Sequence, residues 1–335
     1  MSEVNKVNAV AIADIETING VASADIESTD GVDFVTGFSN TYSISIGNNG
    51  GTPNYSYLKV ANPTSYNFIE GADGDSGRTA PYGDAPFSVS LWFQQDTFTA
   101  SPFISQAVPG AGGSVIVWSI KIGGGKYVFA QLYDPSGYYI AIYDTSHDWS
   151  GLSSGWHHLV LTYSAPSGSG ANTIGGEANR AGSEARRDAM LYHMDGTLYT
   201  AGSTAYPICY NSSPPAYAPC YTGLRTEAAG TVNIGGMNPG TNQTFRGKLD
   251  EVSIWTKALT TADVTAIYNS GTPTDLSTHV SASNLLSWWR MGDNDGGTGT
   301  TVTDVQGIGD GTAYGAAGGG VGWSATSGFD TDVPP

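Results

Sequence analysis

The feature that most constrains the fold is a period-two alternation of apolar and polar residues that runs through the middle of the chain. It is clearest at 87–94, Phe-Ser-Val-Ser-Leu-Trp-Phe-Gln, where Phe87, Val89, Leu91 and Phe93 fall on one face of an extended strand. Similar runs recur at Tyr42–Ile46, Ser114–Lys121, Tyr127–Tyr133, Tyr138–Tyr143, Trp156–Tyr163, Ala189–His193, Thr231–Ile234 and Gly247–Trp255. Clusters of Gly, Pro, Asn and Ser separate them, and no helical pattern lies between them. Many short strands without interleaved helices predict an all-β, antiparallel sandwich.

One segment has the pattern of a helix. Thr260 and Asp263 give a capping start, Val264 and Ile267 give an apolar stripe, and Gly271 supplies a stop. We therefore expect a short helix over 260–269 that covers a sheet.

The first 32 residues contain a repeat with a period of eleven. Residues 13–21, Ala-Asp-Ile-Glu-Thr-Ile-Asn-Gly-Val, match residues 24–32, Ala-Asp-Ile-Glu-Ser-Thr-Asp-Gly-Val, and 3–10 is a degenerate earlier copy. Asn-Gly and Asp-Gly are strong signals for tight turns, so each copy predicts a pair of small strands. Because so few residues bury little apolar surface alone, we expect residues 1–32 to dock on another protein or on copies of this chain. A poorly ordered tail is the alternative.

Two further segments interrupt the strand pattern. Ser167–Ala185 is rich in Gly, Ser and Ala, and Tyr206–Tyr221 is rich in Tyr and Pro, so both are expected to be long loops in an insertion at 165–230. Cys209 and Cys220 lie in the second of them, and they either form one local disulfide or stay reduced. A Gly-, Thr- and Asp-rich composition then begins near residue 276 and continues to Pro335.

The charge of the chain argues against two classes of partner. It has 13 Lys and Arg against 30 Asp and Glu, for a net charge of −17, so nucleic acid and anionic membrane surfaces are not expected partners. No stretch is long and apolar enough to span a membrane. The first residues, Met-Ser-Glu-Val-Asn-Lys, lack the pattern of a signal peptide, so export by that route is not expected.

Three motifs, in this order and spacing, resemble those of laminin G-like, concanavalin A-like jelly-roll modules. They are Trp-His-His-Leu-Val-Leu-Thr-Tyr at 156–163, Asp-Gly-Thr-Leu at 195–198, and Gly-Lys-Leu-Asp-Glu-Val-Ser-Ile-Trp at 247–255 followed by Lys-Ala-Leu-Thr at 257–260. The resemblance covers about residues 41–271 and implies a jelly-roll β-sandwich. It leads us to expect an N-terminal arm at 1–40, a jelly roll at 41–275 and a C-terminal extension at 276–335.

The repeats and the run that follows residue 268 also resemble structural virion proteins of marine tailed bacteriophages. That resemblance implies a location on the virion surface after assembly in the host cytoplasm, with residues 1–32 bound to capsid, neck or tail proteins and with a homo-oligomeric state. The implied function is non-enzymatic: a capsid decoration, head fibre or tail fibre that presents a lectin-like sandwich. The alternative function is an adhesin that binds host surface glycans.

Asp250 is the candidate metal ligand. In a regular strand it shares a face with Val252 and Ile254, so its carboxylate would be buried and would need a partner. Related jelly rolls use the Asp of this motif to bind calcium, which accepts carboxylate and carbonyl oxygens. A carboxylate capped by backbone N–H groups is the alternative. Gly47 stands where many relatives have an aspartate at the end of the first strand.

Catalytic and other metal-binding patterns find little support. Retaining glycosidases need two carboxylates about 5–5.5 Å apart, and the alternating carboxylates of jelly-roll glycosidases do not occur here. His157 and His158 are neighbours on a strand, so they point to opposite faces and cannot bind one metal together. We expect no enzyme activity.

Aromatic residues supply the remaining candidates. Tyr133, Tyr138, Tyr139, Tyr143 and Trp149 gather around two neighbouring strands, and further tyrosines populate the insertion. Exposed rings of this kind favour contacts with proteins or with sugar faces. The candidates for an interface or a glycan site are Tyr138, Tyr139, Trp149, Tyr206, Tyr210, Tyr217 and Tyr221, with a subunit interface expected before sugar binding.

Overall fold

In the computed structural model the chain divides into two compact units, Met1–Asn40 and Thr41–Pro335. The structure describes six two-residue strands between Lys6 and Asp33, and in the remainder the residues 38–47, 56–60, 63–70, 83–96, 101–108, 115–124, 126–135, 137–152, 154–165, 180–199, 221, 223–225, 230–237, 244–316, 320–324 and 327–335. Within these residues no helix is long and apolar enough to cross a membrane.

The first unit contains three antiparallel hairpins that follow the sequence repeat. They pair β1 (Lys6–Val7) with β2 (Val10–Ala11), β3 (Thr17–Ile18) with β4 (Val21–Ala22), and β5 (Ser28–Thr29) with β6 (Val32–Asp33). The first strands begin at residues 6, 17 and 28, so each hairpin is displaced from the one before by the period of eleven. This confirms the prediction of small strands around each Asn-Gly and Asp-Gly turn.

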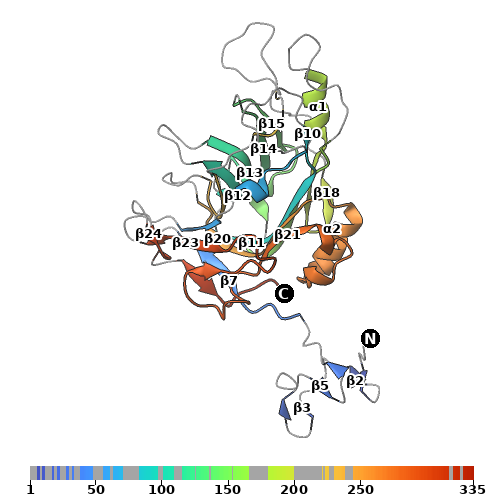
Figure 1. The fold of residues 1–335 in the computed structure, drawn as a ribbon, viewed down its shortest axis with the longest axis vertical. Helices are drawn as coiled ribbons and strands as arrows, with labels where there is room; N and C mark the ends of the chain where they lie inside the picture. Colours follow the sequence, from blue (N-terminus) through green and yellow to red (C-terminus); the bar gives the residue numbers. More distant parts are fainter. Residues whose placement is uncertain are drawn as a thin grey trace. The chain divides into compact units, whose positions relative to one another are not determined.

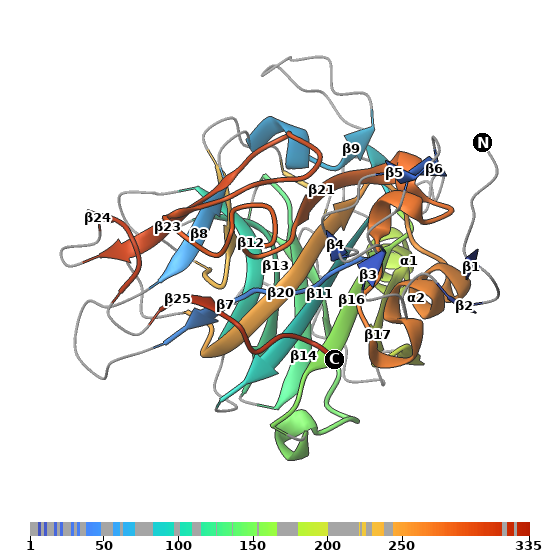
Figure 2. The same cartoon turned by 90° about the horizontal axis from the view of Figure 1, so that it is seen from below.

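The second unit is a sandwich of two antiparallel sheets. The eight-stranded sheet has the order β18-β17-β16-β11-β20-β7-β25, with β21 also paired to β20. Figure 2 shows β20, β11, β16 and β17 side by side in one layer. Its strands are β7 (Ser43–Ile46), β11 (Phe87–Gln95), β16 (His157–Tyr163), β17 (Met190–Met194), β18 (Thr197–Tyr199), β20 (Gly247–Trp255), β21 (Leu285–Trp289) and β25 (Gly328–Asp330).

The nine-stranded sheet has the order β15-β14-β13-β12-β19-β8-β23-β22, with β24 paired to β23. Its strands are β8 (Tyr57–Val60), β12 (Ser101–Val108), β13 (Val115–Gly123), β14 (Tyr127–Tyr133), β15 (Tyr139–Tyr143), β19 (Thr231–Ile234), β22 (Thr301–Val302), β23 (Gly311–Ala316) and β24 (Gly320–Val321). A small hairpin of β9 (Ile69–Glu70) and β10 (Gly83–Asp84) stands apart from both sheets. The antiparallel β-sandwich predicted from the alternation is therefore confirmed.

The core lies between the two sheets and consists of the inward side chains of both. In β11 these are Phe87, Val89, Leu91 and Phe93, as the alternation predicts, and their rings and branches are almost fully buried. Burying apolar surface of this kind is the main favourable term in folding, about 25 cal/mol for each Å² removed from water.

The helix α2 (Thr261–Tyr268) confirms the predicted helix and its capping. Thr260 is the N-cap and forms a reciprocal capping box with Asp263. The end differs from the prediction, because Asn269 takes the left-handed conformation with φ of 45° and caps the helix before Gly271. Tyr268 stacks on Trp92 at a centroid distance of 5.8 Å, so α2 covers the outer face of the eight-stranded sheet.

Two expectations about the chain's organisation are wrong. The helix α1 (Arg180–Asp188) lies within the range expected to be an insertion of loops, and it contacts β15 and β17 (Figure 1). Arg, Ala and Glu favour helix, which the dilution of the strand pattern obscured. Residues 276–335 are also no separate extension, because β21 and β25 complete one sheet and β23 pairs with β8 in the other.

Candidate functional site

The candidate site is the outer face of β14 and β15, at one edge of the nine-stranded sheet (Figure 1). The even-numbered residues of these strands, such as Val128, Leu132 and Ile140, belong to the core between the sheets. The odd-numbered residues therefore point to the other side of the sheet. We call the five rings on that side, Tyr127, Phe129, Tyr133, Tyr139 and Tyr143, the aromatic face.

The rings of the aromatic face contact one another across the two strands. Tyr133 is paired with Tyr139, and their ring centroids are 5.0 Å apart at an interplanar angle of 36°. The Tyr143 ring meets Phe129 and Tyr127 edge to face at 5.2 Å and 5.3 Å. The four tyrosines are half-buried and Phe129 is buried, so the face presents tyrosine rings to its surroundings. Such contacts fix the ring orientations before any ligand arrives.

Gly123 on β13 allows Tyr143 to lie across the neighbouring strands. A Cβ atom at Gly123 would be 2.8 Å from the Tyr143 ring and 3.1 Å from the Cβ of Phe129. Contacts under 3.0 Å force a shift, so any larger residue at position 123 would move the Tyr143 ring. The missing side chain is thus part of the site's geometry.

A polar side chain holds one of the tyrosines from the same face. Gln131 Nε2 donates to the Tyr133 hydroxyl at 3.1 Å, and Ser119 Oγ on β13 lies 3.5 Å from Gln131 Oε1. Burial, with the neighbouring Tyr139, raises the pKa of Tyr133 to about 12. Its hydroxyl therefore stays protonated at neutral pH and can both donate and accept a hydrogen bond.

The residues proposed from the sequence as interface or glycan candidates lie in different parts of the structure. Tyr139 lies within the aromatic face, and Tyr138, also half-buried, precedes it at the start of β15. Tyr206, Tyr210 and Tyr217 lie outside the described residues, as do Cys209 and Cys220. Tyr127 and Phe129 were missed by the sequence argument, although they share the parity of Tyr133 in the predicted strand.

Trp149 belongs to a second aromatic cluster beside the face. Its ring meets Tyr199 edge to face at 5.1 Å and lies nearly parallel to His147 at 6.0 Å. Asp144, which is buried below them, accepts hydrogen bonds from His147 Nδ1 at 2.7 Å and from the Tyr192 hydroxyl. Burial alone would raise the pKa of Asp144, but bonds from Ser146, Tyr192 and His147 hold that pKa below its usual value.

Tyr221 is a core residue, which contradicts its expected role in an interface or a glycan site. Its exposed fraction is 0%, and its hydroxyl donates to Asp84 Oδ2 at 3.1 Å. The Tyr163 hydroxyl donates to the same oxygen at 2.5 Å, and Arg186 Nε of α1 lies 3.6 Å from it. A buried carboxylate needs such partners, so the ring that looked like loop surface completes a polar cluster inside the sandwich.

Asp250 is buried, but it does not point between the sheets as its parity predicts. Leu249 and Val252 both belong to the core, although they are three residues apart and would face opposite sides of a regular strand. The pairing with β11 shifts there, and Glu251 has φ of 47°, which marks a β-bulge. The extra residue places Asp250 opposite Trp92, on the outer face of the eight-stranded sheet.

One carboxylate oxygen of Asp250 accepts a hydrogen bond from the backbone N–H of Glu251 at 2.8 Å. The described part of the chain holds no group of three or more His, Cys, Asp or Glu side chains suited to a metal ion. Around Asp250 the described His, Cys, Asp and Glu side chains would therefore supply at most two ligands, and other oxygens, such as main-chain carbonyls, would have to complete a calcium shell. Calcium binding at Asp250 stays a prediction.

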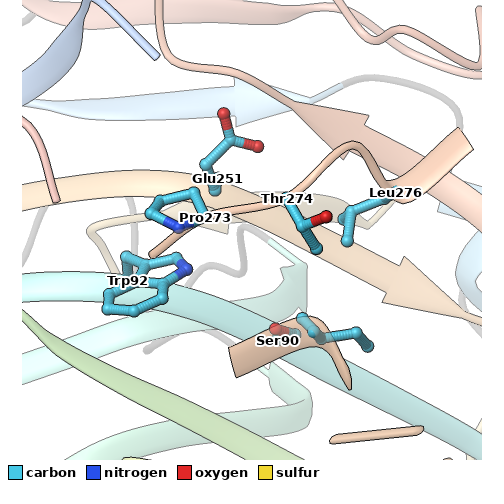
Figure 3. Close-up of a pocket in the computed structure, with 7 residues that line it drawn as sticks. Ser90, Trp92, Glu251, Pro273, Thr274 and Leu276 are labelled. Atoms are coloured by element: carbon cyan, nitrogen blue, oxygen red, sulfur yellow. The ribbon is translucent and has the colours of Figure 1, made fainter. Parts of the chain in front are cut away.

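A small cavity lies beside the bulge, beneath the segment that follows α2. Ser90, Trp92 and Glu251 line it from the sheet, and Ile267, Pro273, Thr274 and Leu276 line it from above. Figure 3 shows the Glu251 carboxylate pointing away from the Trp92 ring. That carboxylate accepts from Trp288 Nε1 at 2.5 Å and pairs with Arg290 Nε at 3.2 Å, so it is held by protein partners.

With the sandwich and the aromatic face described, the chain, an antiparallel β-sandwich of two sheets, can be compared with known proteins. No family model and no curated protein sequence matches it. Among solved structures, a proposed carbohydrate-binding protein from Bacteroides ovatus aligns with a TM-score of 0.43 and 14% identity, over 89% of this chain and 62% of that one. This chain thus spans less than two thirds of that protein.

Two further structures show the range of similarity. A heptameric SAP-like pentraxin from Limulus polyphemus aligns with a TM-score of 0.37 and 15% identity, over 68% of this chain and 82% of that one. The CBM40 domain of a Ruminococcus gnavus sialidase, bound to sialyllactose, aligns with a TM-score of 0.32 and 11% identity, over 55% of this chain and 83% of that one.

Proposed function

We propose that this protein is a non-enzymatic glycan-binding β-sandwich whose aromatic face is the sugar-binding surface. The observation that carries the proposal is the placement of the five rings on the side of β14 and β15 that faces away from the core. Four of them are tyrosines that are half-buried and do not belong to the core between the sheets. Amphipathic rings in that situation favour contact with a partner that has apolar faces and hydroxyl groups.

A sugar ring offers that combination. Its C–H face can stack on Tyr139 or Tyr143, and its hydroxyl groups can exchange hydrogen bonds with Tyr133. The contacts among the rings, together with Gln131 and Gly123, hold the side chains in place beforehand. A site prepared in this way loses little conformational entropy on binding.

The proposal is of binding alone because the face lacks the groups for hydrolysis. The residues paired with the rings, or with Gln131 between them, across β13–β15 are Ser119, Lys121, Gly123, Gln131 and Ala141, and none carries a carboxylate. Glycosidases commonly require two carboxylates that flank the bond to be cleaved.

We further propose that the N-terminal hairpins attach the sandwich to a particle. Three hairpins with a constant spacing of eleven residues offer repeated, equivalent edges to a partner. A virion that carries many copies, as a capsid decoration, head fibre or tail fibre, is the proposed setting, with capsid, neck or tail proteins as partners. The protein would then be a homo-oligomeric adhesin whose glycan-binding face projects from the virion surface.

A glycan array tests the binding proposal. The wild-type protein is expected to retain a set of glycans, and Tyr133→Ala and Tyr139→Ala are each expected to weaken that binding at an unchanged fold. Tyr268→Ala, which removes a half-buried tyrosine of α2 that packs on the other sheet, is the matched control and should keep the binding. Gly123→Ala keeps all five rings but displaces Tyr143, so it should also weaken binding. Equal binding by all four variants would rule out the aromatic face.

A further inference from the structure

The outer face of the nine-stranded sheet carries two lysines that pair with none of the described carboxylates. Lys121 lies on β13 beside Phe129, and Lys59 lies on β8 in the same sheet. Among the residues that the structure describes, no carboxylate forms an ion pair with either side chain. Both are half-buried.

This is unusual for a chain with 30 acidic and 13 basic residues. The other described lysines of the sandwich each pair with aspartate: Lys126 with Asp148 at 3.2 Å, Lys248 with Asp332 at 2.7 Å, and Lys257 with Asp263 at 3.0 Å. Because carboxylates outnumber cations more than twofold, a lysine without one needs an explanation. The two exceptions share the face on which the rings lie.

Their contacts leave the ammonium groups able to take a ligand. Lys121 Nζ lies 4.7 Å from the centroid of the Phe129 ring and 3.8 Å from Met237 Sδ, which is a weak acceptor. Lys59 Nζ lies 5.2 Å from the centroid of the Tyr314 ring. An ammonium group has three N–H donors. An aromatic ring or a thioether sulfur is a weaker partner for them than a charged oxygen, which forms a charge-assisted hydrogen bond. Burial also lowers the pKa of Lys121, as expected for a cation without a counter-charge.

The spacing of the lysines bears on the size of the ligand. Strands β12 and β19 separate β13 from β8, so Lys121 and Lys59 are three strand spacings apart, or about 14 Å across the sheet. One sugar ring does not reach both. A ligand that contacts both needs acidic groups on different residues of a chain.

We propose that the glycan bound by this face is an acidic polysaccharide, whose carboxylate or sulfate oxygens contact Lys121 and Lys59 while its rings stack on the tyrosines. This rests on the proposed glycan binding and names its ligand class. The net charge of −17 repels such a polymer at long range, so the two ammonium groups must act locally, against the general field.

The test compares ligands that share a backbone and differ in charge. Titration calorimetry with oligogalacturonate and with its methyl ester, which has the same backbone without the charges, is expected to show tighter binding of the charged form. Lys121→Met keeps the apolar stem against Phe129 and should weaken oligogalacturonate binding about 10- to 100-fold, as for loss of a hydrogen bond to a charged group. Binding of the ester should stay unchanged, and Lys121→Arg should preserve the preference.

Further arms sharpen the result. Lys59→Met is expected to weaken the binding of long charged oligomers more than the binding of short ones. Titration with sulfated galactan oligomers shows whether sulfate can take the place of carboxylate. Lys248→Met, which removes a paired lysine from the other sheet, is the control and should change nothing. If Lys121→Met weakens both ligands equally or neither, or if the wild type binds charged and esterified forms equally, the acidic ligand class is wrong while glycan binding stands. If the wild type binds no glycan of any charge, the proposed function itself fails.

Discussion

The Tyr221 hydroxyl donates a hydrogen bond to Asp84, and both side chains are buried inside the sandwich. Asp84 also accepts from Tyr163 and from the backbone N–H of Leu224 at 2.7 Å. The β9–β10 hairpin, which carries Asp84, is thereby joined to β16 and to the chain that precedes β19. One carboxylate thus connects segments that are far apart in the sequence.

We expect Tyr221→Phe to lower the free energy of unfolding by about 1.5–3 kcal/mol, because it removes a hydrogen bond to a buried carboxylate. Urea unfolding of the variant and the wild type measures this. Tyr138→Phe is the control: its backbone N–H bonds to Asp134, but no hydrogen bond of its hydroxyl is found in the described structure, so its effect should stay within about 0.5 kcal/mol. A Tyr221→Phe variant as stable as Tyr138→Phe would contradict the cluster's role.

Glu251 makes stability depend on pH. Burial raises its pKa to about 7, despite the opposing effect of Arg290 and the bond from Trp288. The folded state therefore holds a proton that the unfolded state releases near its ordinary pKa of 4.5. The stabilising contribution of this group is complete below pH 4.5 and is lost as the pH rises toward 7.

Glu251→Gln removes this titration, so the free energy of unfolding of the variant should fall less than that of the wild type between pH 4.5 and 7. Urea unfolding at several pH values gives both slopes. Parallel curves would show that Glu251 is ionised throughout this range. Asp293, which also pairs with Arg290 at 2.9 Å, is unchanged in the variant and titrates in both proteins.

The calcium prediction for Asp250 has a thermal consequence. An ion bound only by the folded state adds about 2.7 kcal/mol at a hundredfold excess over its Kd, so chelation should lower the melting temperature. Scanning calorimetry with and without chelator tests this. If chelation has no effect and Asp250→Asn still destabilises, the carboxylate stabilises the fold through protein partners, among them the Glu251 N–H, and not through an ion.

Deleting residues 1–32 should leave the melting temperature of the sandwich nearly unchanged, because Met1–Asn40 and Thr41–Pro335 form separate compact units. The same deletion should abolish attachment to virions, which a co-sedimentation assay with purified particles measures. A truncated protein that loses cooperative unfolding would show that the hairpins contribute to the stability of the sandwich.

Alternation predicted most of the sandwich from sequence, because residues such as Phe87 and Phe93 face one core. The bounds predicted for β14, β19 and β20 are those observed. Alternation fails where a buried polar residue interrupts it: β12 places Gln106 next to Trp118 and was missed.

The details of the site depend on a β-bulge and on contacts between distant residues, which the alternation of apolar and polar residues does not predict. A single inserted residue at Glu251 reverses the direction of Asp250, and no local signal marks that bulge. Tyr221 looked exposed because it ends a stretch rich in Pro and Tyr, whereas its partner Asp84 is 137 residues away. Tyr133, Tyr139 and Tyr143 were noticed because they gather on two neighbouring predicted strands, whereas Tyr127 and Phe129, which share the parity of Tyr133, were missed.

The most direct test of the central claim is a crystal structure of the protein with a glycan that it binds on the array. We predict a sugar ring stacked on the aromatic face, in contact with Tyr139 or Tyr143 and within hydrogen-bond distance of the Tyr133 hydroxyl. A glycan bound at the loop ends of the sandwich, or beneath α2 beside Glu251, with the aromatic face unoccupied, would contradict the account.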